Sequence, residues 1–205
     1  PGTCWQIDPG IRHAPGSLVT YEPQVNSDVF AMYQSLVEGR AVPWDLLVKD
    51  VPKEHHQDID YLIDMLDWEG NVDPDFSAKR LFHPQPVGPL DEMKASGYQE
   101  NWIVFSTAYY SAKELTIFPG ASVTVKDAAA YGVIVIQGHG TFGKHEVETP
   151  SLIRFGEMTK DEVFVSVDAA RNGVTIQNQS DCENLVMLKH FGPGNPQAPS
   201  KRASS

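Results

Sequence analysis

The most informative segment for the fold is Glu114-Leu115-Thr116-Ile117-Phe118-Pro119-Gly120-Ala121-Ser122-Val123-Thr124-Val125. Two short runs rich in β-branched residues flank a Pro-Gly pair, which is typical of two strands joined by a tight turn. Similar runs recur over residues 101–191, at 102–105, 132–136, 151–153, 163–167, 174–176 and 185–188. Short strands at regular spacing, separated by turn residues, predict an all-β antiparallel sandwich or barrel.

The hydrophobic period changes from strand to helix over residues 26–85. Apolar spacing predicts helices over 29–37, 44–49 and 59–66, the last one capped by Asp58 and ended by Gly70. Leu62 and Leu66 should be buried, because the apolar helix faces need a sheet to cover. The acidic residues of the third helix are interpreted as a solvated face rather than an ion site. Residues 71–100, rich in Pro, Asp and Gly, should form an extended connection.

Composition argues against several functional classes. The 205 residues include 27 acidic and 16 basic side chains, for a formal net charge of −11. Such a surface repels phosphate backbones and anionic lipid, so neither a nucleic acid nor a membrane is an expected partner. The longest apolar stretch, 131–136, is far too short for a membrane span. Cys4 and Cys182 are interpreted as free thiols in a reducing cytoplasm, with a single disulfide left open.

The first residues carry dense strand and turn signals and no targeting pattern. Residues 1–25 predict strand, turn and strand, with the turn at Asp8-Pro9-Gly10. We therefore expect that structure preceding residue 1 is missing or sits on another chain. Unpaired edge strands favour partner association, either as a homo-oligomer or with a missing N-terminal half. Residues 192–205 have too few apolar side chains to offset the entropy of ordering and should form a flexible tail.

The motif Gly2-x5-Asp8-Pro9-Gly10-x2-His13-x3-Ser17 carries the sharpest chemical signal. A tight turn followed by a strand would aim His13 at a barrel mouth, where a neutral imidazole can bind a divalent metal. The plain alternative is a surface histidine beside a turn. The motif resembles the second motif of the cupin superfamily, with Asp8 at a position where proline is usual and Ser17 where asparagine is usual.

The residues that follow narrow the resemblance. Ile7–Ala14, Glu22, Asn26–Val29 and Asp58–Trp68 together resemble the type I phosphomannose isomerases over about residues 3–68, and by architecture beyond that. The resemblance implies an all-β cupin jelly-roll sandwich or barrel with a helical insertion. It divides the chain into terminal strands of a first barrel (1–25), a helical insertion and connection (26–100), a second barrel (101–191) and the tail (192–205).

The resemblance also implies a metal site and a substrate class. In that family one zinc is held by a glutamine, a glutamate and two histidines, of which only the last histidine has a counterpart here, His13. The substrate would be a sugar or sugar phosphate, and the cofactor a divalent metal, zinc first, if upstream ligands are present. The catalytic arginine of the family has no counterpart in residues 29–34, so no catalytic residue is assigned.

The second barrel lacks the metal residues of the cupin pattern. Aligned on Asn178, Val174 stands at the histidine position, while Lys126 and Ala128 stand in the region of the other ligands. We therefore expect no metal in this barrel. Adjacent His55 and His56, and the histidines at 139 and 145, are interpreted as solvated, and Cys4 as an inert thiol.

Three functional hypotheses stay open from the sequence. The first is a metal-dependent, phosphomannose-isomerase-like cupin that acts on a sugar or sugar phosphate. The second is a non-catalytic carbohydrate-binding or structural cupin, which the absent arginine favours. The third is an Fe(II) cupin oxygenase, because one histidine does not encode the identity of the metal.

Overall fold

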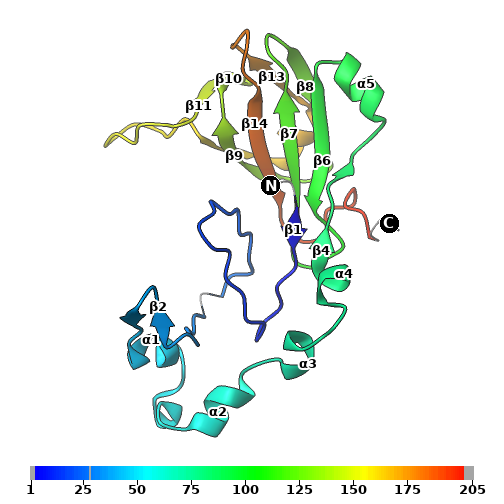
Figure 1. Cartoon of the computed structure of the whole chain (residues 1–205). Helices are drawn as coiled ribbons and strands as arrows, with labels where there is room; N and C mark the ends of the chain where they lie inside the picture. Colours follow the sequence, from blue (N-terminus) through cyan, green and yellow to red (C-terminus); the bar gives the residue numbers. More distant parts are fainter. Residues whose placement is uncertain (1–2, 28, 201–205) are drawn as a thin grey trace. The chain divides into compact units, whose positions relative to one another are not determined.

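The computed structural model describes residues 3–27 and 29–200 and divides into two compact units (Figure 1). The jelly-roll unit contains the described residues of Pro1–Trp5 and Leu81–Ser205. The inserted unit is Gln6–Arg80. Across these described ranges, every helix is too short or too polar to cross a membrane.

Eight strands of the jelly-roll unit pair in a nested order. They are β7 (Ser111–Ile117), β8 (Ser122–Val125), β9 (Tyr131–Gln137), β10 (His139–Phe142), β11 (His145–Glu148), β12 (Glu162–Val165), β13 (Val174–Asn178) and β14 (Leu185–Phe191). The first strand pairs with the last, β8 with β13, β9 with β12, and β10 with β11, all antiparallel. This nesting is the wrapping of a jelly roll, so the expected all-β fold with a helical insertion is confirmed.

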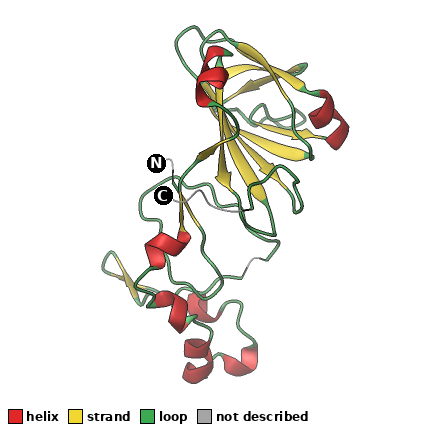
Figure 2. Cartoon of the chain, turned by 90° about the vertical axis from the view of Figure 1, so that its right-hand side faces the viewer, coloured by secondary structure: helices red, strands yellow, loops and turns green. Residues whose placement is uncertain are grey.

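The nested strands form two sheets that enclose one core (Figure 2). One sheet has the order β12-β9-β14-β7-β6-β5, with β6 at Tyr98–Val104 and β5 at Gln85–Pro86, and the other has the order β11-β10-β13-β8. Alternate side chains of β7, β9 and β14 point inward, because side chains on a strand alternate between its faces. Fully buried members of this core include Leu115, Ile117, Val133, Leu185 and Met187.

Short elements complete the jelly-roll unit. Strand β1 (Cys4–Trp5) pairs antiparallel with β4 (Leu81–Phe82), so the inserted unit lies between two paired segments in sequence. Helices α5 (Leu90–Ala95) and α6 (Val167–Asn172) were not expected from the sequence. Helix α5 lies in the stretch 71–100, which is therefore less extended than predicted.

The inserted unit is mostly coil with short helices around a small core of its own. Its elements are β2 (Leu36–Val37), β3 (Arg40–Ala41), α1 (Trp44–Val48), the 3-10 helix η1 (Lys53–His55), α2 (Ile59–Asp64), α3 (Trp68–Asn71) and α4 (Phe76–Arg80). Leu62 is buried, as expected, but it packs against Val48 and Val51 rather than against a sheet. Leu66 is only half-buried.

Several predicted elements of the inserted unit are absent or shorter. The described residues of the predicted helix 29–37 are coil up to β2, and the strand expected near Leu18–Tyr21 is also coil. The helix expected over 59–66 ends at Asp64, and Gly70 lies inside α3 instead of ending α2. A β-rich segment becomes a strand only when another strand pairs with it, and residues 6–27 have no such partner among the described residues.

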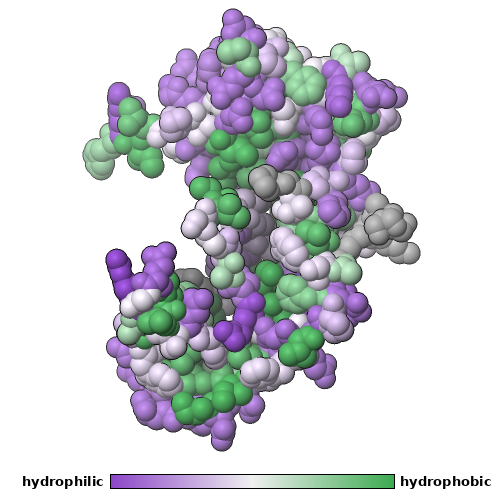
Figure 3. Space-filling model, in the orientation of Figure 1, coloured by the Kyte–Doolittle hydropathy of each residue, from purple (hydrophilic) through white to green (hydrophobic). Residues whose placement is uncertain are grey.

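The predicted strand 151–153 is also absent. These residues belong to an arm between β11 and β12 (yellow in Figure 1) whose apolar side chains are exposed. Figure 3 shows hydrophobic residues gathered on this projecting arm. They are Leu152, Ile153, Phe155 and Met158.

Candidate functional site

The turn Asp8-Pro9-Gly10 is held in place by the region of α3. Gly10 has a φ of 78°, and a Cβ at this position would lie 2.6 Å from the backbone nitrogen of Asp67. The Gly10 carbonyl accepts hydrogen bonds from the Asp67 backbone (3.1 Å) and from the Asn71 side chain (2.7 Å). Glycine is therefore required here by both its conformation and the close approach of a second backbone.

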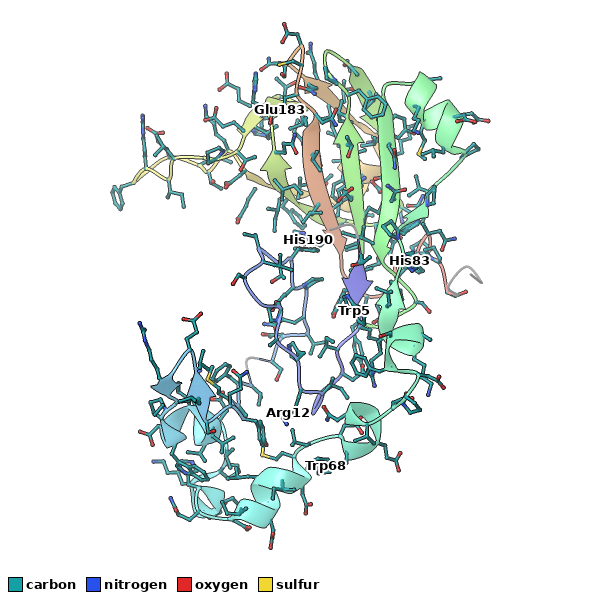
Figure 4. All side chains as sticks on the ribbon, viewed as in Figure 1. Trp5, Arg12, Trp68, His83, Glu183 and His190 are labelled. Carbon is teal, nitrogen blue, oxygen red and sulfur yellow. The ribbon has the colours of Figure 1, made fainter. Side chains whose placement is uncertain are left out.

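Polar contacts on either side of the turn reinforce this anchor. The Arg12 backbone donates to the Asn71 side chain at 2.9 Å, and Figure 4 shows Arg12 beside this part of the unit. Asp8 accepts from Gln6 at 3.0 Å and pairs with Arg80 at 2.5 Å. The hydrogen bond from Gln6, together with Arg80, lowers the pKa of the Asp8 carboxyl. The turn is thus a rigid part of the inserted unit.

His13 directly follows this anchored turn and is exposed. Its Nδ1 lies 3.0 Å from the carbonyl oxygen of Ile11, which fixes the ring on its own backbone. A neutral imidazole whose Nδ1 donates to a carbonyl leaves Nε2 as the atom available to a metal. The role of His13 as a metal ligand stays a prediction.

The described residues do not fit a complete metal site. Within residues 3–27 and 29–200, no three side chains of His, Cys, Asp or Glu come together in a way that could hold an ion. A single imidazole supplies one of the four ligands that a protein zinc site needs. A metal bound by His13 would therefore need further ligands from outside the described residues.

The interior of the jelly roll holds a closed ring of four charges, which we call the charge ring: Glu100, Lys113, Asp127 and Lys189. Asp127 binds Lys113 through Oδ1 (2.6 Å) and Lys189 through Oδ2 (2.5 Å). Glu100 binds Lys189 through Oε1 (2.7 Å) and approaches Lys113 through Oε2 (3.5 Å). All four residues are at most 5% exposed, so the ring is sealed from solvent.

Strand alternation and one loop bring the charge ring together. Lys113 and Lys189 face each other across the β7–β14 pair on its core face, and Glu100 reaches in from β6. Asp127 comes from the loop after β8, where its backbone nitrogen donates to the carbonyl of Ala170 in α6 at 3.0 Å. Opposite charges are thus drawn from four separate parts of the chain.

Aromatic rings pack against both ammonium groups. Lys113 lies 4.6 Å from the centre of the Trp102 ring, and Lys189 lies 4.7 Å from that of Tyr131. Phe191 contacts both, at 5.5 and 6.0 Å. Burial by itself would lower the pKa of Lys189, but Glu100 and Asp127 outweigh burial and raise it. Lys189 therefore stays charged, held by two carboxylates and two ring faces.

Tyr131 differs from the other members of this aromatic layer in having a buried hydroxyl. That hydroxyl has no hydrogen-bond partner among the described residues. Burial, above all other effects, raises the pKa of Tyr131 to about 12. Burial therefore keeps the phenol neutral to higher pH than in an exposed tyrosine, and no described residue positions its hydroxyl as an acid or a base.

The cupin-motif alignment on Asn178 points to positions in the barrel that neighbour the buried charged residues but are not themselves part of the charge ring. Val174 and Ala128 are half-buried and Lys126 is exposed, whereas Asp127, between the last two, is buried in the charge ring. The missed signal was strand alternation, which places Lys189 on the same face as Leu185, Met187 and Phe191. A lysine on the apolar face of a core strand predicts buried acidic partners.

On the opposite face of β14, His190 covers Gly132 of β9. A Cβ at Gly132 would overlap the imidazole, so the glycine makes room for the ring, which Figure 4 labels. Burial lowers the pKa of His190. His190 therefore belongs to the outer face of the sheet and is separate from the charge ring.

The remaining sequence candidates make structural contacts or are exposed. His55 pairs with Asp58 at 3.2 Å and stacks on Tyr61, and His56 bonds the Val51 carbonyl at 2.9 Å. His139 and His145 are exposed on β10 and β11. Cys4 and Cys182 are both free, and burial raises the pKa of the Cys4 thiol, which reduces its reactivity.

Comparisons with known proteins identify likeness in fold alone. No protein-family model matches the chain, and no curated protein matches it. Similar solved structures include a cupin 2 domain-containing protein from Halorhodospira halophila, at 18% identity and a TM-score of 0.35, covering 53% of this chain and 68% of that one. A cupin 2 conserved barrel domain protein from Rhodopseudomonas palustris has 12% identity and a TM-score of 0.35, covering 55% and 72%.

A third similar structure is the complex of SigE with the anti-sigma ChrR from Rhodobacter sphaeroides. It has 12% identity and a TM-score of 0.35, and the match covers 47% of this chain and 44% of that one. The match thus spans less than half the length of the chain in that complex. Likeness at this level carries no inference about ligand or chemistry, and the jelly roll rests on the nested strand pairing.

Proposed function

We propose that the jelly-roll unit is a non-catalytic cupin domain with a carbohydrate-binding or structural role. The charge ring carries this proposal, because it occupies the barrel interior with four mutually neutralising side chains. Every carboxylate oxygen of Glu100 and Asp127 already faces an ammonium group. A metal entering this space would have to displace a buried lysine, and breaking a buried ion pair is costly.

Metal analysis of the purified chain tests this proposal. The chain is incubated with excess Zn²⁺ or Fe²⁺, desalted, and analysed for bound metal and for its melting temperature. We expect no stoichiometric metal in the His13→Ala variant and no change of its melting temperature with EDTA. Stoichiometric metal that raises the melting temperature of this variant would overturn the proposal, because it would place an ion outside the His13 turn.

A second candidate is supported by the anchored turn. A metal-dependent, phosphomannose-isomerase-like activity on a sugar or sugar phosphate would use His13 together with ligands from a polypeptide outside the described residues. The rigid attachment of Gly10 and Arg12 to Asp67 and Asn71 supports this, because metal ligands need a fixed backbone. This candidate requires association with the polypeptide that supplies the other ligands.

The second candidate is tested by measuring the metal content of the chain together with the polypeptide that would supply the other ligands. We expect His13→Ala to lower the metal content sharply, while His83→Ala, which replaces another exposed histidine, leaves it unchanged. Bound zinc would favour the isomerase-like activity, and bound iron an Fe(II) oxygenase. Equal metal content in the wild type and His13→Ala would remove this candidate.

A further inference from the structure

A cavity of about 380 Å³ lies at one end of the jelly roll. One wall is the loop between β6 and β7, and the other is the segment that follows β14 (red in Figure 1). At this end β6 and β14 finish and β7 begins, as their antiparallel register requires. The volume is within the range of small-molecule sites and suits a ligand the size of a monosaccharide.

The floor of the cavity is a buried polar pair. Ser111, the first residue of β7, is 3% exposed, and Asn195 is 9% exposed. The Asn195 amide nitrogen lies 3.5 Å from the Ser111 hydroxyl oxygen, which is a long hydrogen bond. Within the described part of the chain the Ser111 hydroxyl proton has no acceptor, so it is available to donate to a ligand.

The two walls are held together by a strained residue. Ser106 has a φ of 59°, which is rare for a residue with a side chain. Its backbone nitrogen donates to the Pro199 carbonyl at 3.0 Å, and its hydroxyl to the Ser200 carbonyl at 3.1 Å. Backbone strain of this kind persists where the surrounding structure fixes it, and it is common at binding sites.

Among residues 3–27 and 29–200, no charged side chain lines the cavity. Hydroxyl and amide groups come from Ser106, Thr107, Ser111 and Asn195, and Tyr110 adds an aromatic ring. Hydroxyl groups both donate and accept, which complements the hydroxyl groups of a sugar. A phosphate dianion, by contrast, needs a cationic partner, and the net charge of −11 repels it further.

We propose that this cavity binds a neutral, polyhydroxylated ligand of monosaccharide size and rejects its phosphorylated form. The inference rests on the proposed non-catalytic role and makes it specific, because it names the ligand class and the residues that bind it. Sugar hydroxyls would replace the long contact between Asn195 and Ser111 with shorter bonds. The charge ring, which begins two residues further along β7 at Lys113, supports the cavity without contacting the ligand.

The test measures binding of D-glucose and D-mannose, and of their 6-phosphates, by ligand-observed NMR and titration calorimetry with EDTA present. For a ligand of this size we expect a dissociation constant on the order of millimolar for at least one neutral hexose. The dissociation constant of its 6-phosphate should be higher by a factor of about ten or more. Ser111→Ala should weaken hexose binding by about 3- to 10-fold, the usual effect of one hydrogen bond.

Two glycines provide a matched pair of blocking and control variants. Gly192 lines the cavity and Gly88 does not, both precede a proline, and a Cβ at either meets no atom within 4 Å. Gly192→Phe should abolish hexose binding, while Gly88→Phe should retain it, with circular dichroism spectra of both variants unchanged. Absence of binding by both neutral hexoses, equal binding in the two variants, or preference for the 6-phosphates would overturn the inference.

The two proposals fail in different measurements. If metal is found inside the barrel, the non-catalytic role fails even if a neutral hexose binds. If no metal is found and no hexose binds, the proposed non-catalytic role is retained and the proposed carbohydrate site is rejected. EDTA in the binding assay keeps these two readouts separate.

Discussion

Lys113 and Lys189 each carry a full charge on the core face of a strand, where apolar residues are the rule. The cost of removing an ammonium from water is offset only when opposite charges and hydrogen bonds replace its hydration. Asp127 satisfies both lysines at 2.5 and 2.6 Å, which makes it the central member of the charge ring. Each charged residue of the ring therefore offsets the cost of burying its oppositely charged neighbours.

Removing one lysine should destabilise the protein strongly. Lys189→Met leaves Glu100 and Asp127 with a single cation in a buried site, and we expect it to lower the free energy of unfolding by about 3–5 kcal/mol. Urea denaturation measures this. Lys160→Met, which removes a lysine from exposed ion pairs with Glu146 and Glu148, should change stability by less than about 1 kcal/mol.

A double variant measures the energetic coupling between Lys189 and Asp127 and separates it from the independent effect of each substitution on stability. In Lys189→Met the carboxylates of Glu100 and Asp127 share Lys113 alone. Adding Asp127→Asn removes one of these two carboxylates, so the double variant should lose less than the sum of the two single losses. Strictly additive losses would show that the two residues do not interact in solution.

Tyr131 should make stability depend on alkaline pH. Its pKa rises from an ordinary value of 10 in the unfolded chain to about 12 in the folded one. Between these values the folded state keeps a proton that the unfolded state loses, so stability is complete below pH 10 and falls as pH rises. The expected slope for this one group is about 1.4 kcal/mol per pH unit.

The variant Tyr131→Phe isolates that contribution. The buried hydroxyl has no partner among the described residues, so its removal should change stability at pH 7 by less than about 1 kcal/mol. Denaturation curves from pH 8 to 12 should show the wild type losing its relative stability above pH 10. A constant difference between the two proteins across this range would contradict the buried, neutral phenol.

At the scale of elements, close approach of strands decides which residues β10 tolerates. Gly140 faces Asn178 in the β10–β13 pair, and a Cβ there would overlap the backbone carbonyl oxygen of Gln177. A carbonyl within a ladder cannot move aside as a flexible side chain can. Gly140 is therefore required by packing alone. Gly138, two residues earlier, is required both by its φ of 83° and by the Asn184 carbonyl oxygen, which would lie 2.5 Å from a Cβ there.

Gly140→Ala should thus disrupt the pairing of β10 with β13. We expect a loss of more than about 2 kcal/mol in the free energy of unfolding, measured by chemical denaturation. Gly88→Ala, placed where a Cβ meets no neighbouring atom, should stay within about 0.5 kcal/mol of the wild type. Similar losses in both variants would point to a general effect of glycine replacement rather than to the strand contact.

At the scale of the whole molecule, two separate hydrophobic cores predict two levels of stability. The jelly-roll core includes fully buried residues from β7, β9 and β14, whereas the inserted unit buries chiefly Val48, Val51 and Leu62. Local stability follows the buried apolar contacts of each region. In native-state hydrogen exchange, amides of β7 and β14 should therefore exchange at least about tenfold more slowly than those of α1 and α2.

Leu62→Ala should act on the inserted unit. We expect it to cost about 2–5 kcal/mol locally and to speed exchange in α1 and α2, while Ile63→Ala at the exposed neighbouring position has little effect. Exchange in β7 and β14 should be unchanged by either variant. Faster exchange in these strands would show that the two cores unfold together.

The fold class could be predicted from the amino-acid sequence, because strand runs and turn residues are local signals. The runs at 114–118, 122–125 and 185–188 fall within β7, β8 and β14 or overlap them, and Asp58 caps α2 as predicted, accepting from Tyr61 at 3.1 Å. The same local reasoning identified the turn before His13. Periodicity and turn chemistry are properties of neighbouring residues, and they need no tertiary contact to be recognised.

Long-range contacts, by contrast, determine which of the predicted helices and strands form and which charged side chains pair. The apolar spacing of 29–37 does not produce a helix, since short helices need a packed partner to be stable. The charge ring joins residues 89 positions apart, Glu100 and Lys189. Strand alternation can indicate that Lys189 is buried, but no local pattern identifies which acidic residues pair with it. The cavity between 106–111 and 192–200 has the same origin, because antiparallel strand pairing brings these distant segments to one end of the barrel.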